Sequence, residues 1–309
     1  MKIKFAYCLC MVLCVACSSA QQLGDTSFVP HIEKPTFDIG KGPVVKIDEA
    51  HHNFHTMNGR YCAFAEVLRH DGYRVKANTS EFNFDSLRAC SILVISNALN
   101  ERNTEDWSLP TPSAFTDEEI EIVRRWVEDG GALFLIADHM PFPGAAEKLA
   151  AVFGFEFSNG FAFDTLKEGR DIFRRSDGSL RAHKITDGME PSGRIDSVAT
   201  FTGQAFGANR EHEAIIVFDS SYVVLLPEIA WEFDEKTETL PIAGWMQAAT
   251  TKYGKGRVFV SGEAAMFSCQ IGSGGSGFGL TSPEAAQNLR YLRNIMSWLS
   301  GSIDSSQFD

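Results

Sequence analysis

The chain has 309 residues, 44% of them hydrophobic, and it carries 40 Asp and Glu residues against 28 Lys and Arg, giving a formal net charge of −12 at pH 7. A chain of this length and apolar content can bury a large core, and without repeats or a long linker it predicts one elaborated domain. The acidity argues against nucleic acid as a partner, because phosphate binding needs concentrated Lys and Arg.

The first residues predict export. Two lysines precede an apolar run over residues 5–16, which is too short to span a bilayer as a mature helix. Two processing sites compete. The run LCVAC, ending at Cys17, is typical of a bacterial lipoprotein signal, whereas the residues after it suit an ordinary signal peptidase that cleaves after Ala20. We favour lipidation of Cys17, because a polar tether follows it. The protein is then periplasmic or associated with the outer membrane, and it touches the membrane only through this anchor; plain secretion is the alternative.

The whole chain divides into four segments by composition and pattern. Residues 1–16 form the expected signal peptide, 17–42 a tether and lead-in segment, 43–300 an α/β domain with a less regular insertion at about 155–240, and 301–309 a C-terminal tail. Of the seven cysteines, the domain keeps Cys62, Cys90 and Cys269. These three make no disulfide framework and no CxxC zinc site. A single bridge between Cys62 and Cys90 is one option in an oxidising compartment, but we favour three buried thiols.

Apolar runs alternate with helical patterns along the domain. Strands are expected at 44–47, 73–76, 91–96, 132–137, 215–218, 222–226 and 257–261, and helices at 60–70, 145–153 and 283–299, the last with Ser282 as its cap. The clearest helix begins at Thr116, where Glu119 completes a capping box, and ends at Gly130. Such alternation predicts a doubly wound α/β fold with a mainly parallel sheet.

Ligands of such folds bind beyond the carboxyl ends of the strands, where loops and helix N-termini converge. In this chain those ends carry acidic, amide and imidazole side chains: Asp48, Glu49, His51, His52, Asn97, Asp138, His139 and Glu263. Carboxylates crowded at one edge cannot all stay ionised unless a cation, a proton or a Lys or Arg partner neutralises them. The sequence therefore predicts a polar site at this edge.

A divalent, zinc-like metal is the first option, with His51, Asp138 and His139 as ligands and Glu49 or Glu263 as general base, while Asp48, His52 and Asn97 contact a small polar ligand. The competing interpretation is structural: His and Asn cap helices, and Asp138 and Glu263 pair with Arg60 or Arg74. Neither an HExxH nor a GxSxG motif occurs. Trp231 is a candidate sugar platform if it is exposed.

Several stretches together resemble a known superfamily. GGALFLIADH, HKITDGM, YGKGRVFVSGEAAMF and the closing helix that ends in WLSG are similar to the class I glutamine amidotransferase-like superfamily, in particular its trehalose-utilisation-like members and uncharacterised, often secreted bacterial relatives. DEAHHNFHT followed by GRY resembles the latter group. The resemblance covers residues 43–300 and implies a flavodoxin-like three-layer sandwich.

The resemblance also implies a nucleophilic cysteine on the turn after ALFLIA in true amidotransferases. Here that turn reads Asp138-His139-Met140, so glutamine hydrolysis by a thiolate is not expected. Two hypotheses follow: an exported protein that binds a small polar, carbohydrate-derived ligand and hydrolyses it with metal assistance, or a binding or scaffold module that keeps the fold without the chemistry.

Overall fold

The computed structural model describes residues 23–167, 169–271 and 277–305. A nine-stranded sheet with the order β3-β2-β4-β5-β15-β14-β10-β6 forms its centre, and β11 also pairs with β14. The strands β2 (Val44–Asp48), β3 (Arg74–Asn78), β4 (Ile92–Ser96), β5 (Ala132–Ile136) and β15 (Gly256–Ser261) are parallel. In chain order these five strands have the spatial order 2-1-3-4-5, which is the flavodoxin-like order. The α/β fold with a mainly parallel sheet is therefore confirmed.

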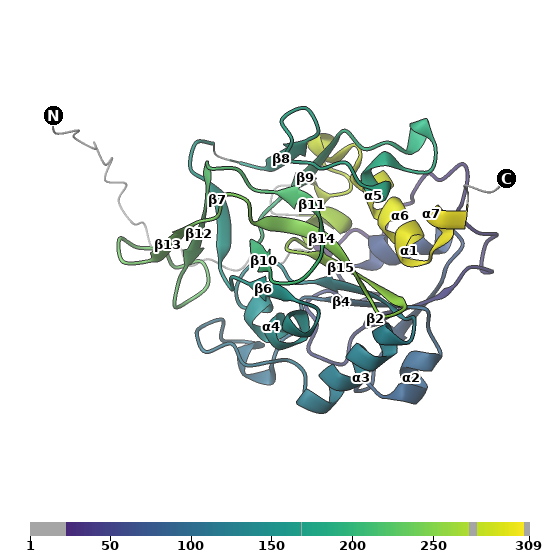
Figure 1. Cartoon of the computed structure of the whole chain (residues 1–309), viewed down its shortest axis with the longest axis horizontal. Helices are drawn as coiled ribbons and strands as arrows, with labels where there is room; N and C mark the ends of the chain where they lie inside the picture. Colours follow the sequence, from purple (N-terminus) through teal and green to yellow (C-terminus); the bar gives the residue numbers. More distant parts are fainter. Residues whose placement is uncertain (1–22, 168, 272–276, 306–309) are drawn as a thin grey trace.

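Helices cover both faces of this sheet. In Figure 1, α1 (Cys62–His70) and α6 (Asn288–Leu299) lie on one side, and α2 (Phe84–Arg88), α3 (Asp117–Glu128) and α4 (Phe142–Val152) lie on the other. Successive side chains of a strand point to opposite faces. Phe134 of β5 accordingly joins the core under α6, while its neighbours Leu133 and Leu135 join the core under α3 and α4. Burial on two faces explains why the central strands β4 and β5 read as continuous apolar runs, whereas the edge strand β3 does not.

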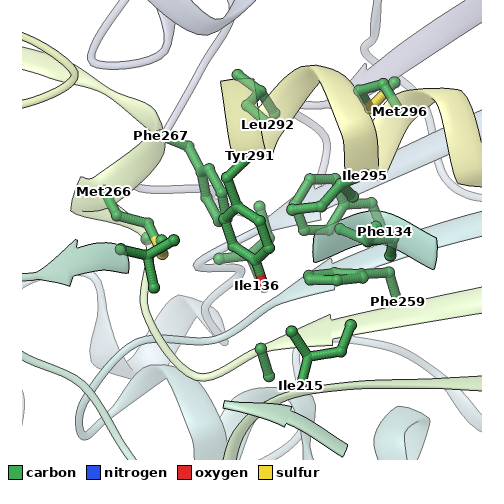
Figure 2. Packing of buried hydrophobic residues seen from close by; sticks show 14 of the residues in the cluster. Phe134, Ile136, Ile215, Phe259, Met266, Phe267, Tyr291, Leu292, Ile295 and Met296 are labelled. Atoms are coloured by element: carbon green, nitrogen blue, oxygen red, sulfur yellow. The ribbon is translucent and has the colours of Figure 1, made fainter. Parts of the chain in front are cut away.

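Aromatic and aliphatic side chains fill the core under α6. The rings of Phe134 and Phe259 meet edge to face, with centroids 5.0 Å apart, and Figure 2 shows Tyr291 and Ile295 of α6 packed above them. On the opposite face, α3 begins as its capping box predicts. The Thr116 hydroxyl accepts a hydrogen bond from Glu119 N at 3.2 Å, and Glu119 Oε2 accepts one from Thr116 N at 3.0 Å. This box fixes Glu119 near the carboxyl end of the sheet.

The predicted insertion at 155–240 is a sheet extension with two side sheets. Its strands β6 (Phe155–Phe157), β10 (Phe206–Ala208) and β11 (Glu213–Val217) continue the main sheet beside β14 (Met246–Tyr253) in antiparallel pairs. The strands β7 (Phe161–Asp164), β12 (Tyr222–Leu226) and β13 (Glu238–Pro241) form a separate three-stranded sheet at the left of Figure 1. β8 (Asp171–Arg174) pairs with β9 (Ser197–Thr200).

Short elements complete the described chain. They are β1 (Leu23–Gly24), β16 (Cys269–Ile271), β17 (Gly277–Gly279), α5 (Lys184–Asp187), α7 (Ser302–Ser305) and the 3-10 turns η1 (Glu101–Asn103), η2 (Pro191–Gly193), η3 (Ala265–Phe267) and η4 (Pro283–Ala285). The start of the predicted tail is thus helical, and Arg257 Nη2 donates to Asp304 Oδ2 at 2.8 Å.

Two predicted boundaries are wrong. The last helix begins at Asn288, not at residue 283, because Ser282 does not cap it: the Ser282 hydroxyl donates to Glu284 Oε2 at 2.6 Å, and the chain first makes the η4 turn. The helix expected at 145–153 begins earlier, at Phe142.

The three cysteines of the domain are free, with Cys90 and Cys269 buried and Cys62 half-buried. In the part of the chain that the structure describes, no helix has the length and apolarity to cross a bilayer. The signal peptide, Cys17 and the tether up to residue 22 lie outside the described residues.

Candidate functional site

The carboxyl end of the parallel sheet gathers the predicted polar residues, but in two separate groups. One group joins the loop after β2 to the start of α3. The other joins the ends of β4, β5 and β15. The structure does not place His51 with Asp138 and His139 as a metal-binding set, and among the described residues no group of three His, Cys, Asp or Glu side chains could hold a metal ion.

The first group is a buried bridge made by His51. Its Nδ1 lies 2.7 Å from Asp48 Oδ2, and its Nε2 lies 2.8 Å from Glu119 Oε1. The rings of Phe82 and Phe115 flank the imidazole, with centroids 4.5 and 4.8 Å away. The side chains of Asp48 and His51 are 0% and 5% exposed. His51 therefore ties the end of β2 to the N-terminus of α3.

The charge on this bridge follows from its partners. Burial of the ring lowers the pKa of His51, but the hydrogen bonds and negative charges of Asp48 and Glu119 outweigh burial and raise the pKa above its ordinary value. A doubly protonated ring donates to both carboxylates at once. Both ring nitrogens are thereby hydrogen-bonded to carboxylates, and a structural role accounts for the arrangement.

The second group brings two carboxyls together. β5 and β15 are neighbours in parallel register up to the pair Ile136 and Ser261, so Asp138 and Glu263 each follow two residues beyond that pair. Asp138 is 7% exposed and Glu263 is 0% exposed. Asn97 at the end of β4 has a φ of +48° and accepts a hydrogen bond from Asp138 N at 2.9 Å. Asn97, Asp138 and Glu263 therefore lie together at the carboxyl edge of the sheet, whereas His51 belongs to the first group.

Backbone amides hold both carboxyls in place. Glu263 accepts hydrogen bonds from Ala265 N at 2.9 Å and from Met266 N at 2.8 Å, and Asp138 Oδ1 accepts one from His139 N at 2.8 Å. Burial, followed by the nearby charge of Asp138, raises the pKa of Glu263 well above its ordinary value. Burial also raises the pKa of Asp138 against the opposing charge of His139. Each carboxyl thus favours its protonated form more than a solvated one does.

His139 stands over this pair under an aromatic cover. Its Nδ1 donates a hydrogen bond to the carbonyl oxygen of Met140 at 2.7 Å. The ring stacks on Phe161 with centroids 4.7 Å apart, and Trp231 meets it edge to face, also at 4.7 Å. Trp231 is 49% exposed and has a φ of +70°. It therefore fulfils the condition for a sugar platform.

His55 belongs to this group although the sequence analysis did not single it out. His55 is buried, its ring centroid is 4.5 Å from that of Tyr61, and its Nδ1 is hydrogen-bonded to Ser96 Oγ at 3.3 Å. Burial first, and then the charges of Arg60 and His139, lower the pKa of His55 to about 3. The Tyr61 hydroxyl donates to Ala264 O at 2.9 Å, beside Glu263. The only signal was the position of His55 in a histidine-rich loop after β2.

A pocket of 330 Å³ opens beside these groups, and we call it the switch-point pocket. The loops after β2 and β4 both line it; these two strands are neighbours from which the chain order runs in opposite directions across the sheet. Ligands of doubly wound folds bind at such a reversal of strand order. The lining residues are Leu23, Gly24, His52, Asn53, Phe54, Thr56, Gly59, Arg60, Leu99 and Thr104.

Hydrogen bonds fasten the walls of this pocket to each other. Phe54 N donates to Asn97 O and Leu99 N donates to His51 O, both at 2.9 Å. The Phe54 ring also packs on Trp107 and Phe142, with centroids 5.7 and 5.4 Å away. Trp107 and Phe142 also contact the His139 ring, so Phe54 lines the pocket and packs against the aromatic cover of His139.

Of the residues predicted to contact a ligand, only His52 lines this pocket. Asp48 is committed to the His51 bridge, and Asn97 supports Asp138. Glu49, a predicted general base, accepts a hydrogen bond from Met57 N at 2.6 Å. The expected pairing of Asp138 or Glu263 with an arginine is not found in the described part of the chain: Arg74 Nε donates to Gly42 O, and Arg60 stacks on Phe54.

The buried carboxyl pair predicts how stability depends on pH. Because the folded pKa values of Asp138 and Glu263 are raised, the folded state holds their protons more tightly than the unfolded state does. The free energy of unfolding should then fall as the pH rises above the ordinary carboxyl range of about 4. Asp138→Asn removes one carboxyl and its repulsion of the other, so the variant should lose less stability between pH 5 and pH 8 than the parent. Urea unfolding at both pH values measures this difference, and Asp85→Asn, which removes an exposed carboxylate, is the control. Parallel pH profiles of parent and Asp138→Asn would contradict the expectation.

The fold and this edge of the sheet define the class: a flavodoxin-like α/β protein whose strand ends carry a polar site. No family model matches the chain, and no curated protein matches its sequence. Among solved structures, the mmIFT52 N-terminal domain is similar with a TM-score of 0.59 and 12% identity, over 83% of this chain and 97% of that domain.

Two bacterial structures are also similar. A putative ThuA-like protein from Bacteroides uniformis has a TM-score of 0.48 and 11% identity, over 88% of this chain and 94% of that one. A cytoplasmic protein from Salmonella typhimurium has a TM-score of 0.48 and 12% identity, over 83% of this chain and 98% of that one. At these identities the likeness concerns the fold alone.

Proposed function

We propose that this chain is an exported protein that binds a small polar, carbohydrate-derived ligand in the switch-point pocket. The observation that carries the proposal is the pocket itself, 330 Å³ in size, at the reversal of strand order between β2 and β4. This volume lies at the lower end of the range for small-molecule sites, about 300–1,000 Å³. Its lining mixes apolar side chains with a few polar ones, which is the usual composition of such sites.

Two further features support a carbohydrate-derived ligand. Trp231 presents a half-exposed ring next to His139, and aromatic faces pack well against the apolar faces of sugars. The residues around the turn Asp138-His139-Met140 also resemble trehalose-utilisation-like proteins, which is the finer relationship that we propose within the shared fold. We do not propose an amidotransferase, because this turn lacks the nucleophilic cysteine of that activity.

Ligand binding can be tested with a panel of sugars and sugar acids. Glucose, maltose, glucuronate and glucose 6-phosphate are added to the purified domain, and stabilisation is followed by thermal unfolding and calorimetry. A ligand at about 100 times its Kd should stabilise the folded state by about 2.7 kcal/mol. His52→Ala, which changes the pocket lining, should weaken binding, whereas His70→Ala, which removes an exposed histidine at the far end of α1, should not. Equal binding by the two variants, or no saturable binding, would contradict the proposal.

Hydrolysis of the bound ligand is a second candidate function. Its support is the buried pair of Asp138 and Glu263, for which the described residues provide no Lys or Arg partner, with His139 beside them. A shared proton or a zinc-like divalent cation would neutralise the pair, and either state supplies acid and base chemistry. A metal bound by Asp138 and His139 would need a ligand other than His51, because Asp48 and Glu119 hold both ring nitrogens of His51.

The same panel separates an enzyme from a binding module. Each sugar that binds is incubated with the protein, with and without added Zn²⁺, and the products are identified by mass spectrometry. Turnover that Asp138→Asn abolishes while binding persists supports hydrolysis. Binding without turnover under either condition supports the module that retains the fold and lacks the chemistry.

A further inference from the structure

Arg60 carries a positive charge into the switch-point pocket without a carboxylate to balance it. In the described part of the chain it forms no ion pair: Nη1 donates to the carbonyl oxygen of Phe54 at 3.3 Å, and Nε is buried without a partner. The guanidinium carbon lies 3.7 Å from the centre of the Phe54 ring. Burial alone lowers the pKa of Arg60. One neutral acceptor therefore serves a group with five N–H donors.

The rest of the pocket fits the same electrostatic pattern. None of the described residues that line it is Asp or Glu, although the whole chain has 40 of them against 28 Lys and Arg. His52, Asn53, Thr56 and Thr104 are the remaining polar side chains of the lining. The Thr104 hydroxyl donates to Glu101 O at 2.9 Å, and Asn53 is engaged with His51 N and Ser96 O. Arg60 is thus the strongest donor that faces this pocket from the described residues.

A purely structural role would explain less of this arrangement. Stacking on Phe54 orients the guanidinium, but it leaves the positive charge unbalanced, whereas Arg69 in the same segment pairs with Glu66 at 2.6 Å. Leaving a half-buried cation unpaired is unfavourable, and an anion that enters the pocket would remove that cost. A planar guanidinium matches carboxylate and phosphate groups, which accept two parallel hydrogen bonds from it.

We propose that the ligand of the switch-point pocket carries a carboxylate or phosphate group and that Arg60 binds this group. The inference rests on the proposed function, which it makes more specific: the polar ligand is acidic, for example a sugar acid or a sugar phosphate. Phe54 holds the guanidinium in place, and His52 and Thr104 contact the neutral part of the ligand. Such a site lets an acidic protein select acidic molecules at one position of its surface.

Matched probes test the proposal. Glucose, glucuronate, glucose 6-phosphate, acetate and inorganic phosphate are titrated into the full chain, and affinities are measured by calorimetry at low and high salt. Glucuronate or glucose 6-phosphate should bind about tenfold to a hundredfold more tightly than glucose, which is the range expected for hydrogen bonds to a charged group. Acetate or inorganic phosphate should bind weakly and compete with the sugar acid or sugar phosphate.

Variants of two arginines supply the decisive comparison. Arg60→Gln should abolish the preference for the charged sugar, and Arg60→Lys should keep part of it, because lysine retains the charge without the planar fork. Arg69→Gln removes one positive charge from α1, outside the pocket, and should leave the preference for the charged sugar intact. Melting temperature and circular dichroism establish that each variant is folded.

The outcomes distinguish this inference from the function on which it rests. Equal affinity for glucose and glucuronate, weakened by His52→Ala but unchanged in Arg60→Gln, would overturn the acidic ligand and leave the binding function standing. An acid preference that Arg69→Gln reduces as much as Arg60→Gln would also overturn it, because general charge would then be the cause. Absence of saturable binding by every probe would overturn both proposals.

Discussion

His51→Ala should lower the free energy of unfolding by about 3–5 kcal/mol, the usual cost of removing one partner from a buried ion pair. The reason is that Asp48 and Glu119 lose the imidazolium that forms a hydrogen bond to each of them, while the Phe82 and Phe115 rings lose the group packed between them. Urea unfolding at pH 6 measures the change. Because the pKa of His51 is raised in the folded state, the stability that its protonated ring contributes is fully present below the ordinary histidine pKa. That stability is lost as the pH rises through the pKa of the folded state.

A matched variant separates charge from packing. Asp48→Asn, His51→Ala and Glu119→Gln combined remove the imidazole together with both charges, so this triple variant should be more stable than His51→Ala alone. Glutamine is acceptable at position 119, because it can also complete the capping box of α3. A triple variant that is no more stable than the single one, or a single variant that costs under about 1 kcal/mol, would show that the carboxylates do not depend on His51.

Cys17→Ser should move the protein from the membrane fraction to the soluble fraction almost completely. A lipid anchor of more than one acyl chain holds a protein at a bilayer, whereas a serine cannot be lipidated and leaves no other membrane attachment among the predicted features. Fractionation of cells that express the parent and the variant measures this, and mass spectrometry of the mature N-terminus identifies the processing site. A parent protein that is soluble and begins at Gln21 would instead show cleavage after Ala20 and plain secretion.

Local sequence patterns predicted the sheet well because its strands are buried on both faces. The runs around Val94, Phe134 and Val260 leave no alternative to a central strand, and parallel strands must end at the same edge. That geometry brought Asp138 and Glu263 together as expected, from positions 125 residues apart in the chain. The alternation of strands and helices predicted a doubly wound, mainly parallel sheet, but it gave neither the strand order nor the antiparallel pairing of β14, β10, β6 and β11.

Loop conformation was the part that the sequence could not supply. His51 and Asp138 both follow buried strands, yet the loop after β2 turns His51 toward Glu119. The capping box of α3, which is distant in the sequence, fixes the position of Glu119. The pattern alone gave no reason to connect them. Arg60 was likewise expected to pair with a carboxylate, and only the packing of its guanidinium on Phe54 shows where its charge lies.

The hydrogen bonds that join Phe54 to Asn97 and Leu99 to His51 have a consequence for molecular recognition. They join the two loops that line the switch-point pocket through main-chain groups, whose geometry is largely independent of the side chains. The pocket is therefore preorganised, and binding a ligand should cost little of the entropy that is lost when a flexible loop becomes ordered. Association should then be governed by diffusion and charge attraction, and evolution could retune selectivity by exchanging side chains on an unaltered frame.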